Sequence, residues 1–379
     1  MGSVARYRIL IAIAAAVPLM LSGAACSSGN PASPVAVPSS AGSGGGVPLT
    51  PAPAPQTLYE AGSTLLQQAM GHWAAGYHDQ YPNVVVKPGG GGSTKGISEA
   101  SAGTINIGGS DAYLSSGDLV KNPTLLNVPL AISAQQVNYN VPGLRPGTNL
   151  HLDGLVLAKM YDGTIKTWSN PAISQLNPHV SLPSTPVVPL HRSDGSGDTF
   201  LFTSYLSTHD SNWNRNFGYG TKVAWPKVAG AKGETGNQGM VKGCHDTVGC
   251  VAYIGISFQN AANQAQLGEA ALLNTANQPE LPNKTSIDAA VAAFVSSTPP
   301  NETISMIDGP ASTGYPIVNY EYAIVSTRQH NATTARDLQA FLHWIITTGN
   351  SLPYLGSSQF QPLPGPVVSL SDAQIAKIR

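Results

Sequence analysis

The segment Arg192-Ser193-Asp194-Gly195-Ser196-Gly197-Asp198-Thr199, followed by Phe200, decides how we interpret this chain. We expect a strand to end at its arginine and a helix to begin at the small residues that follow. A helix N-terminus leaves backbone N–H groups unpaired and carries partial positive charge. Glycine lets the backbone approach a ligand, and serine or threonine hydroxyls add donors. The segment therefore predicts a helix start that can hold an anion.

Three further segments share this design of a strand that ends in small polar residues before a helix. They are Ala61-Gly62-Ser63-Thr64-Leu65, Gly91-Gly92-Ser93-Thr94 and Gly109-Ser110-Asp111. Each one alone is also typical of an ordinary helix N-cap. Four such segments in one chain predict helix ends that face one another and form an anion cage without net positive charge.

Two charged side chains refine this prediction. Arg192 has the rigid guanidinium fork that grips a tetrahedral oxyanion with paired hydrogen bonds, although a structural ion pair is the alternative. Asp111 would repel an anion unless the ligand has a proton to donate. Inorganic phosphate keeps one or two such protons at neutral pH, and sulfate has none. An aspartate in the cage therefore favours phosphate over sulfate, whereas an exposed turn aspartate would have no such effect.

Several other functions are excluded or disfavoured by the sequence. Lys95 precedes Gly96, so the glycine-rich run lacks the Gly-Lys-Ser/Thr order of a nucleotide P-loop. Ser196 lacks the spacing of a nucleophile elbow, which disfavours a phosphohydrolase. With 19 Lys and Arg against 20 Asp and Glu, the chain offers no basic stripe for nucleic acid. We expect no metal and no cofactor. A receptor for another oxyanion remains the alternative within the binding class.

The first residues have the pattern of an export signal. Arg6 and Arg8 precede an apolar run from Ile9 to Leu21, and Gly23-Ala24-Ala25-Cys26 follows. We expect residues 1–25 to be a lipoprotein signal peptide, cleaved before Cys26, with palmitate or a similar lipid on that cysteine. Gly23 stands where such boxes usually have leucine, so cleavage without a lipid is the alternative. Either way the protein is exported, and the lipid would anchor it to the outer face of the cell membrane.

Residues 26–56 are rich in Ser, Gly, Pro and Ala and have few large apolar side chains, which predicts a flexible tether. Roughly 320 residues remain, more than one ordinary core, so we expect two domains.

Cys244 and Cys250 lie six positions apart, with His245 between them. In an exported protein the pair favours a disulfide. A metal site is the competing interpretation, but its ligand set would be incomplete.

Alternating strands and helices predict an α/β architecture. Helical spacing predicts a helix from Ser63 or Thr64 whose apolar face is Leu66, Met70, Trp73, Ala74 and Tyr77. Other expected helices are Ser93–Ala102, Leu155–Tyr161 and a last one at Ala335–Thr347; expected strands are Val84–Val86 and Ile105–Ile107; Ala229–Gly243 is expected to be a loop. The β-type segments 131–139 and 316–325 read as two hinge strands between the domains.

The motif residues resemble those of the phosphate-binding receptors of the phosphate-specific ABC transporter, along essentially the whole chain after the tether. The resemblance is densest at Ala61–Thr64, Gly108–Ala112, Lys166–Trp168 with Leu176–Pro178, and Arg192–Phe200. Cys26 and the Cys244/Cys250 loop resemble the actinobacterial lipoprotein branch of that family. The resemblance implies a two-domain periplasmic-binding-protein (Venus-flytrap) fold, with domain I at 57–134 and 319–379 and domain II at 135–318.

The resemblance also implies roles for individual residues. The phosphate-binding positions would be Thr64, Leu65, Ser93, Asp111, Arg192, Ser196, Gly197 and Asp198. Asp111 would accept the ligand proton. The best-known pattern has a threonine at the position of Asp198, where a second carboxylate would favour a phosphate with two protons; charge complementarity at a helix start is the alternative. The implied protein is a monomeric receptor, not an enzyme, that delivers phosphate to membrane permease subunits.

Overall fold

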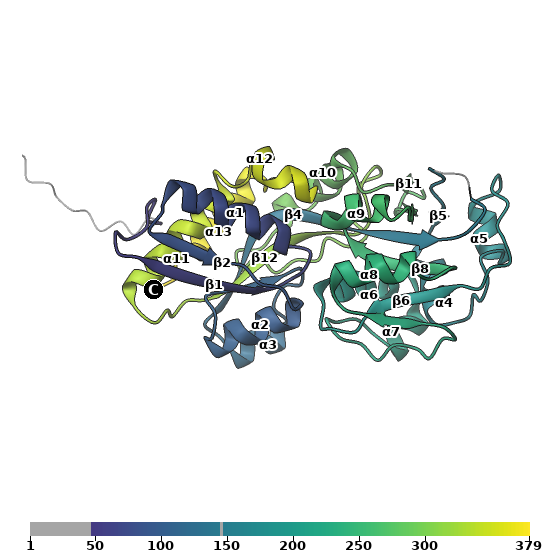
Figure 1. The fold of residues 1–379 in the computed structure, drawn as a ribbon, viewed down its shortest axis with the longest axis horizontal. Helices are drawn as coiled ribbons and strands as arrows, with labels where there is room; N and C mark the ends of the chain where they lie inside the picture. The colour runs from purple at the N-terminus through teal and green to yellow at the C-terminus, as the bar shows by residue number, and fades with distance from the viewer. Residues whose placement is uncertain (1–46, 145–146) are drawn as a thin grey trace, which may run out of the picture. The chain divides into compact units, whose positions relative to one another are not determined.

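Two long antiparallel strands, β4 (Leu125–Asn140) and β12 (Val318–Ser326), run side by side through the middle of the fold (Figure 1). The computed structural model describes residues 47–144 and 147–379. The signal peptide, Cys26 and most of the expected tether therefore lie outside the described residues.

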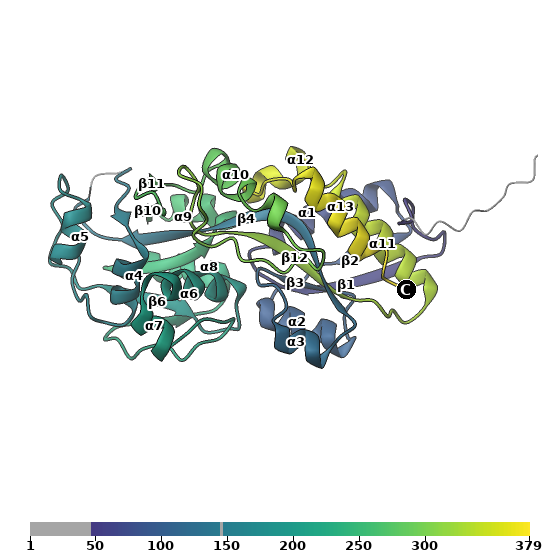
Figure 2. The ribbon, with the colours of Figure 1, turned by 180° about the vertical axis from the view of Figure 1, so that it is seen from behind.

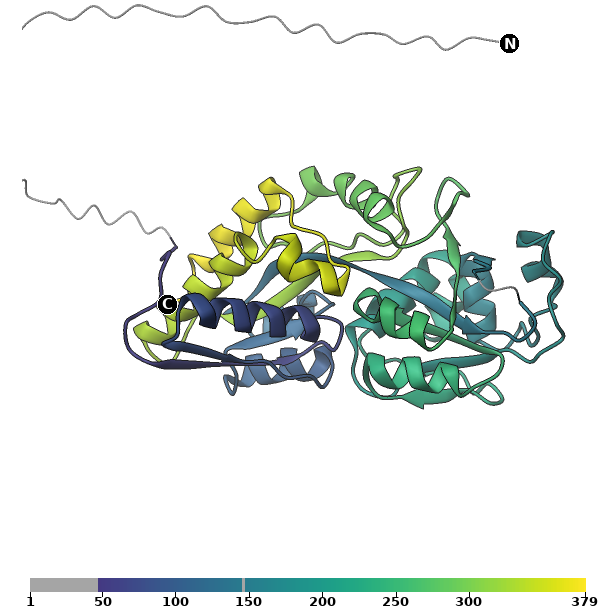
Figure 3. The same cartoon turned by 45° about the horizontal axis from the view of Figure 1, so that its top comes forward.

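Both strands belong to one curled sheet of the described residues. In order across the sheet the strands are β2 (Val84–Lys87), β1 (Gln56–Gly62), β3 (Ile107–Ser110), β12, β4, β8 (Cys250–Gly255), β6 (Val188–Arg192) and β7 (Lys232–Glu234), with β9 (Gly268–Glu269) also paired to β4. The first half of β4 pairs with β12, and its second half, from Gln135, pairs with β8. One continuous strand thus joins two lobes (Figures 2 and 3).

The first lobe contains β1, β2 and β3, which are parallel because helices form the crossovers between them. Its helices are α1 (Gln67–Gln80), α2 (Ser93–Ala102), α3 (Ser116–Lys121), α11 (Ala332–Ile346), α12 (Leu352–Leu355) and α13 (Gly365–Ile375), with the 3₁₀ turn η3 (Gly356–Ser358). Aromatic side chains join α1 to α11: the ring centroid of Tyr77 lies 4.9 Å from that of Phe341 and 5.5 Å from that of Trp344. This buried contact fixes the helices that cover one face of the sheet.

The second lobe is built around β6, β7 and β8. Its helices are α4 (Gly154–Tyr161), α5 (Pro171–Leu176), α6 (Gly197–His209), α7 (Ser211–Asn216), α8 (Gly236–His245) and α9 (Gln259–Gln264), with the 3₁₀ turn η1 (Ile256–Phe258). A small sheet of β5 (His151–Leu152), β10 (Ala271–Leu273) and β11 (Pro279–Glu280) follows, and α10 (Lys284–Ala292) and η2 (Val295–Ser297) lead back to β12. Tyr161, Phe202 and Tyr253 are buried together in its aromatic core.

Several predicted elements are confirmed. Helix α2 has the predicted bounds, α4 begins one residue before the predicted start, and Met70, Trp73, Ala74 and Tyr77 form the buried face of α1. The two hinge strands are the central pair β4 and β12. Strand β4 extends beyond the predicted segment 131–139 at both ends, and β12 begins and ends slightly later than the predicted segment 316–325.

Other boundaries were wrong. Helix α1 begins at Gln67 rather than Ser63, because the Ser63 hydroxyl accepts the N–H of Leu66 (3.0 Å) and closes a turn first. Strand β3 covers Ile107–Ser110 rather than Ile105–Ile107. The expected loop 229–243 contains β7 and most of α8, whose glycines leave room for Glu234 and whose Met240, Val241 and Cys244 are buried. The predicted last helix is α11, and α12 and α13 follow it.

The last part of the expected tether contacts the first lobe. The backbone N–H of Ala52 donates to Asp337 Oδ1 (2.6 Å), and the Asn83 side chain donates to the carbonyl of Ala52 (2.6 Å). The packed part of the chain therefore begins a few residues before β1. Within the described ranges, no helix is both long enough and apolar enough to cross a membrane.

Cys244 and Cys250 form a disulfide that links the end of α8 to the start of β8. Both cysteines are buried, and the loop they close has a sequence separation of 6. Asn140, the last residue of β4, donates to the carbonyls of Cys244 (3.1 Å) and His245 (2.7 Å). The bridge thus fixes a corner of the second lobe where α8, β8 and β4 meet.

Removing this disulfide should destabilise the protein without unfolding it. The short loop predicts a loss of about 2 kcal/mol in the free energy of unfolding, because the unfolded chain regains little entropy. Thermal denaturation of the wild type should show a lower Tm in reductant. A C244A/C250A variant should have a lower Tm than the oxidised wild type, and reductant should not change it. A reductant effect on the double variant, or none on the wild type, would contradict this assignment.

Candidate anion-binding site

The first lobe brings three of the predicted segments to one edge of its sheet. Ser63 and Thr64 follow β1, Ser93 is the first residue of α2, and Asp111 follows β3. Because β1 and β3 are parallel, their carboxyl ends meet at this edge. Ser63 donates to Asp111 Oδ1, and the Ser93 hydroxyl donates to Oδ2 at 3.4 Å. All these side chains except that of Thr64 belong to buried residues, so Asp111 is not the exposed turn aspartate of the alternative.

The second lobe supplies the arginine and the start of a helix. Arg192 is the last residue of β6, and Ser196 is the N-cap of α6, where its hydroxyl accepts the N–H of Thr199 (3.4 Å). Gly197 and Asp198 form the first turn of α6, as predicted. The third predicted segment differs from this design: after Gly109-Ser110-Asp111 the chain bends, and α3 begins only at Ser116.

Arg192 is held by two carboxylates. Its Nη1 donates to Asp198 Oδ2 at 2.5 Å, its Nε donates to Asp194 Oδ1 at 2.7 Å, and its Nη2 also donates to Asp194. The Arg192 side chain is 1% exposed. The guanidinium is thus part of a structural ion pair, which was the alternative interpretation of the sequence. It also lies at the candidate anion site.

The two lobes meet directly at these residues. A Cβ atom added to Gly197 would lie 2.5 Å from Asp111 Oδ2 and 2.6 Å from Ser93 Oγ. The backbone N–H of Thr94 donates to the carbonyl of Gly195 (3.1 Å). We call the buried group Ser63, Ser93, Asp111, Arg192, Ser196, Gly197 and Asp198, together with Thr64, the cage. Leu65 is buried beside it, and its carbonyl accepts from Ser257 Oγ (2.8 Å).

Asn237 lies against the cage, and the sequence analysis missed it. Its fully buried side chain donates to Asp198 Oδ2 (2.9 Å) and to Thr64 Oγ1 (3.1 Å), and its Oδ1 accepts the N–H of Gly255 (2.7 Å). It therefore links the two lobes. It lies at the start of α8, inside the expected loop, and a lone asparagine among glycines gives no sequence signal.

A row of buried polar side chains on the central strands was also missed. Gln135 on β4 donates to Asp198 Oδ1 (3.2 Å), and Ser133, Asn319 and Glu321 lie close to Asp111. Here the sequence had a signal: Ser133, Gln135, Gln136 and Asn138 interrupt the apolar run of this strand. Buried polar groups on a central strand are costly unless they are paired, which points to a site.

The cage changes the proton affinity of its acids. Burial, followed by the charge of Asp198, raises the pKa of Asp111 to about 7, although hydrogen bonds and Arg192 oppose this. Burial also raises the pKa of Asp198, against the opposing effect of Arg192. Burial would raise the pKa of Asp194 too, but its hydrogen bonds to Arg192 and that positive charge hold it below the ordinary value. Asp111 can therefore exchange a proton near neutral pH.

Lys95 does not contribute to the cage. Its side chain is 46% exposed, donates to the carbonyl of Gly90 (3.2 Å) and lies 3.9 Å from Glu99, as expected for a solvated lysine. Over the described ranges, no group of three or more His, Cys, Asp or Glu is placed to hold a metal ion.

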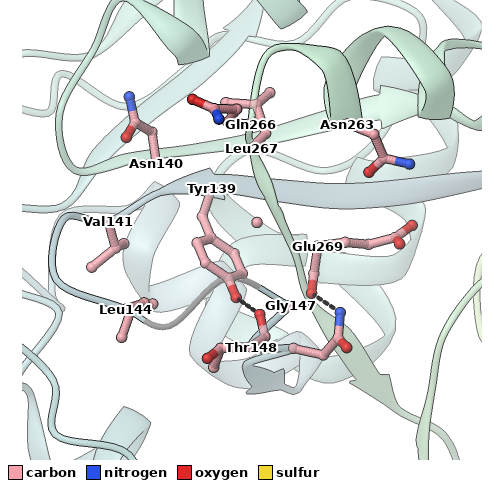
Figure 4. A pocket seen from close by; sticks show the side chains of 12 residues that line it. Tyr139, Asn140, Val141, Leu144, Gly147, Thr148, Asn263, Gln266, Leu267 and Glu269 are labelled. Carbon is pink, nitrogen blue, oxygen red and sulfur yellow. Dashed lines mark hydrogen bonds between the residues drawn. The ribbon is translucent and has the colours of Figure 1, made fainter.

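A larger cavity lies elsewhere, at the far end of β4. It has a volume of about 520 Å³, and Tyr139, Asn263 and Glu269 are among the residues that line it (Figure 4). Tyr139 donates to the carbonyl of Thr148 (2.5 Å), and Asn149 donates to that of Glu269 (2.9 Å). Some of the polar groups that line the cavity are therefore hydrogen-bonded to one another. By contrast, a cavity next to Asp111 and Asn319 measures about 10 Å³.

The raised pKa of Asp111 gives a pH-dependent stability. A carboxyl group whose pKa rises from 3.8 to about 7 on folding stabilises the protein below pH 3.8, and this contribution is lost as the pH rises through about 7. The Tm of the ligand-free protein should therefore fall by several degrees between about pH 5 and about pH 8, and D111N should flatten this fall. Differential scanning calorimetry measures both. The exposed D79N substitution is the control, and equal slopes for D111N and the wild type would contradict the prediction.

Comparisons with known proteins agree with this geometry. The family model of the PBP superfamily domain matches residues 49–348. The phosphate-binding protein PstS of Methanocaldococcus jannaschii is 32% identical over 317 residues, which cover 78% of this chain and 79% of the relative. The phosphate-binding protein PstS 3 of Mycobacterium leprae is 30% identical over 321 residues, covering 81% and 83%.

Solved structures share the fold at low sequence identity. A phosphate-binding protein from Stenotrophomonas maltophilia superposes with a TM-score of 0.61 at 16% identity, covering 84% of this chain and 93% of that one. The high-affinity periplasmic phosphate-binding protein PfluDING, with bound phosphate, gives 0.65 at 22% identity, covering 83% and 92%. The chain has the two-domain α/β fold of periplasmic binding proteins, and it belongs to the PBP superfamily, among the relatives of the PstS phosphate-binding proteins.

Proposed function

We propose that this protein binds inorganic phosphate in the cage and delivers it to the permease of an ABC-type importer. The observation that carries this proposal is the burial of one carboxylate acceptor, Asp111, opposite one guanidinium, Arg192, among serine hydroxyls and the start of α6. Such a site suits a tetrahedral anion that still has a proton. Relatives named as phosphate-binding proteins support the same ligand.

The proposed ligand contacts come from both lobes. Thr64, Leu65, Ser93 and Asp111 would contact phosphate from the first lobe, and Arg192, Ser196, Gly197 and Asp198 from the second. Arg192, Asn237 and Ser196 already donate to Asp198 Oδ2, while Oδ1 has a single donor, Gln135. A ligand proton would therefore go to Oδ1 of Asp198, and phosphate affinity that holds well above pH 7 would contradict this role.

Closure would occur about the central strands. We propose that domain I comprises 57–134 and 319–379 and that domain II comprises 135–318, so that the chain crosses near Ala134 on β4 and near Val318 on β12. These two residues are paired in the strand register, which supports a common hinge line. Ligand bridging across the lobes would stabilise the closed form. No bond is made or broken in this cycle, and the protein acts as a monomeric receptor rather than as an enzyme.

Phosphate capture can be tested by titration calorimetry on residues 47–379, stripped of ligand, with sulfate as competitor. We expect a Kd of about 1 μM or tighter, a binding free energy of about −8 kcal/mol, that excess sulfate leaves unchanged. Equal binding of both anions would reassign the protein to another oxyanion. Binding of neither anion would overturn the proposal.

Gly197 offers a sharp variant. G197A places a methyl group against Asp111 and Ser93 and should weaken phosphate binding by about tenfold to hundredfold, as overpacking costs about 1–3 kcal/mol. G71A is the matched control, because an added Cβ at Gly71 in α1 meets nothing within 4 Å. Wild-type affinity in G197A would place the ligand elsewhere.

We also propose that the protein is held on the outer face of the cell membrane by a lipid on Cys26, after removal of residues 1–25. The signal-type segment and the small residues before the cysteine support this anchor. In cells, C26S should move the protein from the membrane fraction to the soluble fraction, and mass spectrometry should lose the lipid adduct. An unlipidated wild-type protein would instead favour a cleaved signal without an anchor.

A further inference from the structure

A second carboxyl group lies directly behind Asp111. Strand β12 pairs antiparallel with β3, with Ala323 opposite Gly109 and Tyr322 opposite Ser110. At the same end of this paired segment, Glu321 comes directly before Tyr322 and Asp111 comes directly after Ser110. The side-chain amide of Asn319 contacts both residues: it donates to the Asp111 carbonyl (3.3 Å) and to Glu321 Oε1 (2.9 Å). The two carboxyl groups are in hydrogen-bonding contact, and Glu321 is fully buried.

The two oxygens of Glu321 have different surroundings. Oε1 accepts from Ser133 Oγ (2.5 Å) and from Asn319 Nδ2 (2.9 Å). Oε2 is buried and has no hydrogen-bond donor among the described residues. A buried oxygen without a donor is costly if it is charged, but a protonated oxygen there can itself donate. The acceptor within reach is the Asp111 carboxylate.

Two buried carboxyl groups in contact cannot both be ionised, so one of them keeps a proton. Asp111 receives hydrogen bonds from Ser63 and Ser93 and lies near Arg192, all of which favour its ionised form. Among the described residues, the groups that shift the pKa of Glu321 are Asp111, Ser133 and Asn319, and none of them is a cation. Tyr322 also lies near Glu321, and Asp198 acts on Asp111. Burial and the neighbouring Asp111 raise the pKa of Glu321 well above its ordinary value.

We propose that Glu321 is a positioning residue that keeps a proton on Oε2 and donates it in a hydrogen bond to Asp111. This hydrogen bond favours the ionised form of Asp111, whose lone pair is then directed to the ligand. Without the donor, Asp111 would take up a proton itself and become a donor, which suits an unprotonated anion such as sulfate. Glu321 thereby sets the selectivity for protonated oxyanions, an inference that rests on the proposed function.

A neutral Glu321 also limits the charge of the cage. Four carboxyl groups, those of Asp111, Asp194, Asp198 and Glu321, are arranged around one guanidinium, that of Arg192. If all four were ionised, the cage would repel any anion. One proton on Glu321 reduces this excess and leaves Asp111 as the acceptor.

Two substitutions at Glu321 distinguish the effect of its hydrogen-bond donor from the effect of its side-chain volume. E321Q keeps an N–H that can donate to Asp111 and an oxygen that can accept from Ser133 and Asn319, whereas E321L keeps the volume and removes both. Competition calorimetry with phosphate and sulfate, from about pH 6 to about pH 8, measures the ratio of the two affinities. We expect this ratio and its pH profile to be unchanged in E321Q. In E321L we expect it to fall at least about tenfold near pH 8. At that pH Asp111 of the wild type, whose pKa is about 7, is mostly ionised, whereas Asp111 of E321L would keep a proton and offer sulfate a donor.

A wild-type ratio in E321L, or a shifted pH profile in E321Q, would overturn the inference; the second result would mean that Glu321 acts as an ionised group. E99Q on the half-exposed surface of α2 is the matched control.

An infrared measurement tests the proton without relying on binding or on the folding of E321L. Burial also raises the pKa of Glu60 and of Glu302 to about 8, so the spectrum of E321Q is subtracted from that of the ligand-free wild type. The difference spectrum should show the band of a protonated carboxylic acid that persists at about pH 8. Loss of this band in the wild type at that pH would also overturn the inference. If the wild type bound no phosphate, the proposed function would fail, and the infrared result would still decide the state of Glu321.

Discussion

The ion pair between Arg192 and Asp198 is the interaction on which the rest of the site depends. It joins the end of β6 to the first turn of α6, and neither side chain is exposed to solvent. A buried charge of this kind is tolerated only where its partners are complete, because an unpaired ion in a protein interior costs several kcal/mol. Asp194 completes the pairing of the guanidinium, and Asn237, Ser196 and Gln135 complete that of Asp198. The geometry of the cage follows from satisfying these two groups.

The central strands serve two requirements at once. As β4 and β12 they form the continuous part of the sheet, where apolar residues such as Leu130, Val137 and Ile324 are buried. Polar residues such as Gln135 and Glu321 face the cage, so that the wall behind the cage and the connection between the lobes are the same piece of backbone. A change in the lobe angle therefore acts on the groups that contact Asp111 and Asp198. This coupling needs no separate relay of side chains.

The sequence analysis was most accurate for elements whose ends depend on the local preference of a single residue type. The helix start at Ser196, the strand end at Arg192 and the bounds of α2 followed from glycine, hydroxyl and charge patterns. The start of α1 was wrong because Ser63 uses its hydroxyl in a turn, and the loop assigned to 229–243 was wrong because glycines there serve close packing. Asn237 and Glu321 were missed because their partners lie far along the chain: Thr64 is 173 positions from Asn237, and Ser133 is 188 from Glu321.

The contact between the Thr94 N–H and the Gly195 carbonyl involves only main-chain atoms. No side-chain substitution can delete it, but the glycines around it are exposed to mutation. An added Cβ would lie 2.2 Å from the Gly195 oxygen at Gly92 and 2.1 Å from Thr94 Oγ1 at Gly195. Evolution can thus vary the walls of the cage more freely than its seam. Drift in a population should leave a narrow line of invariant glycines where the two lobes touch.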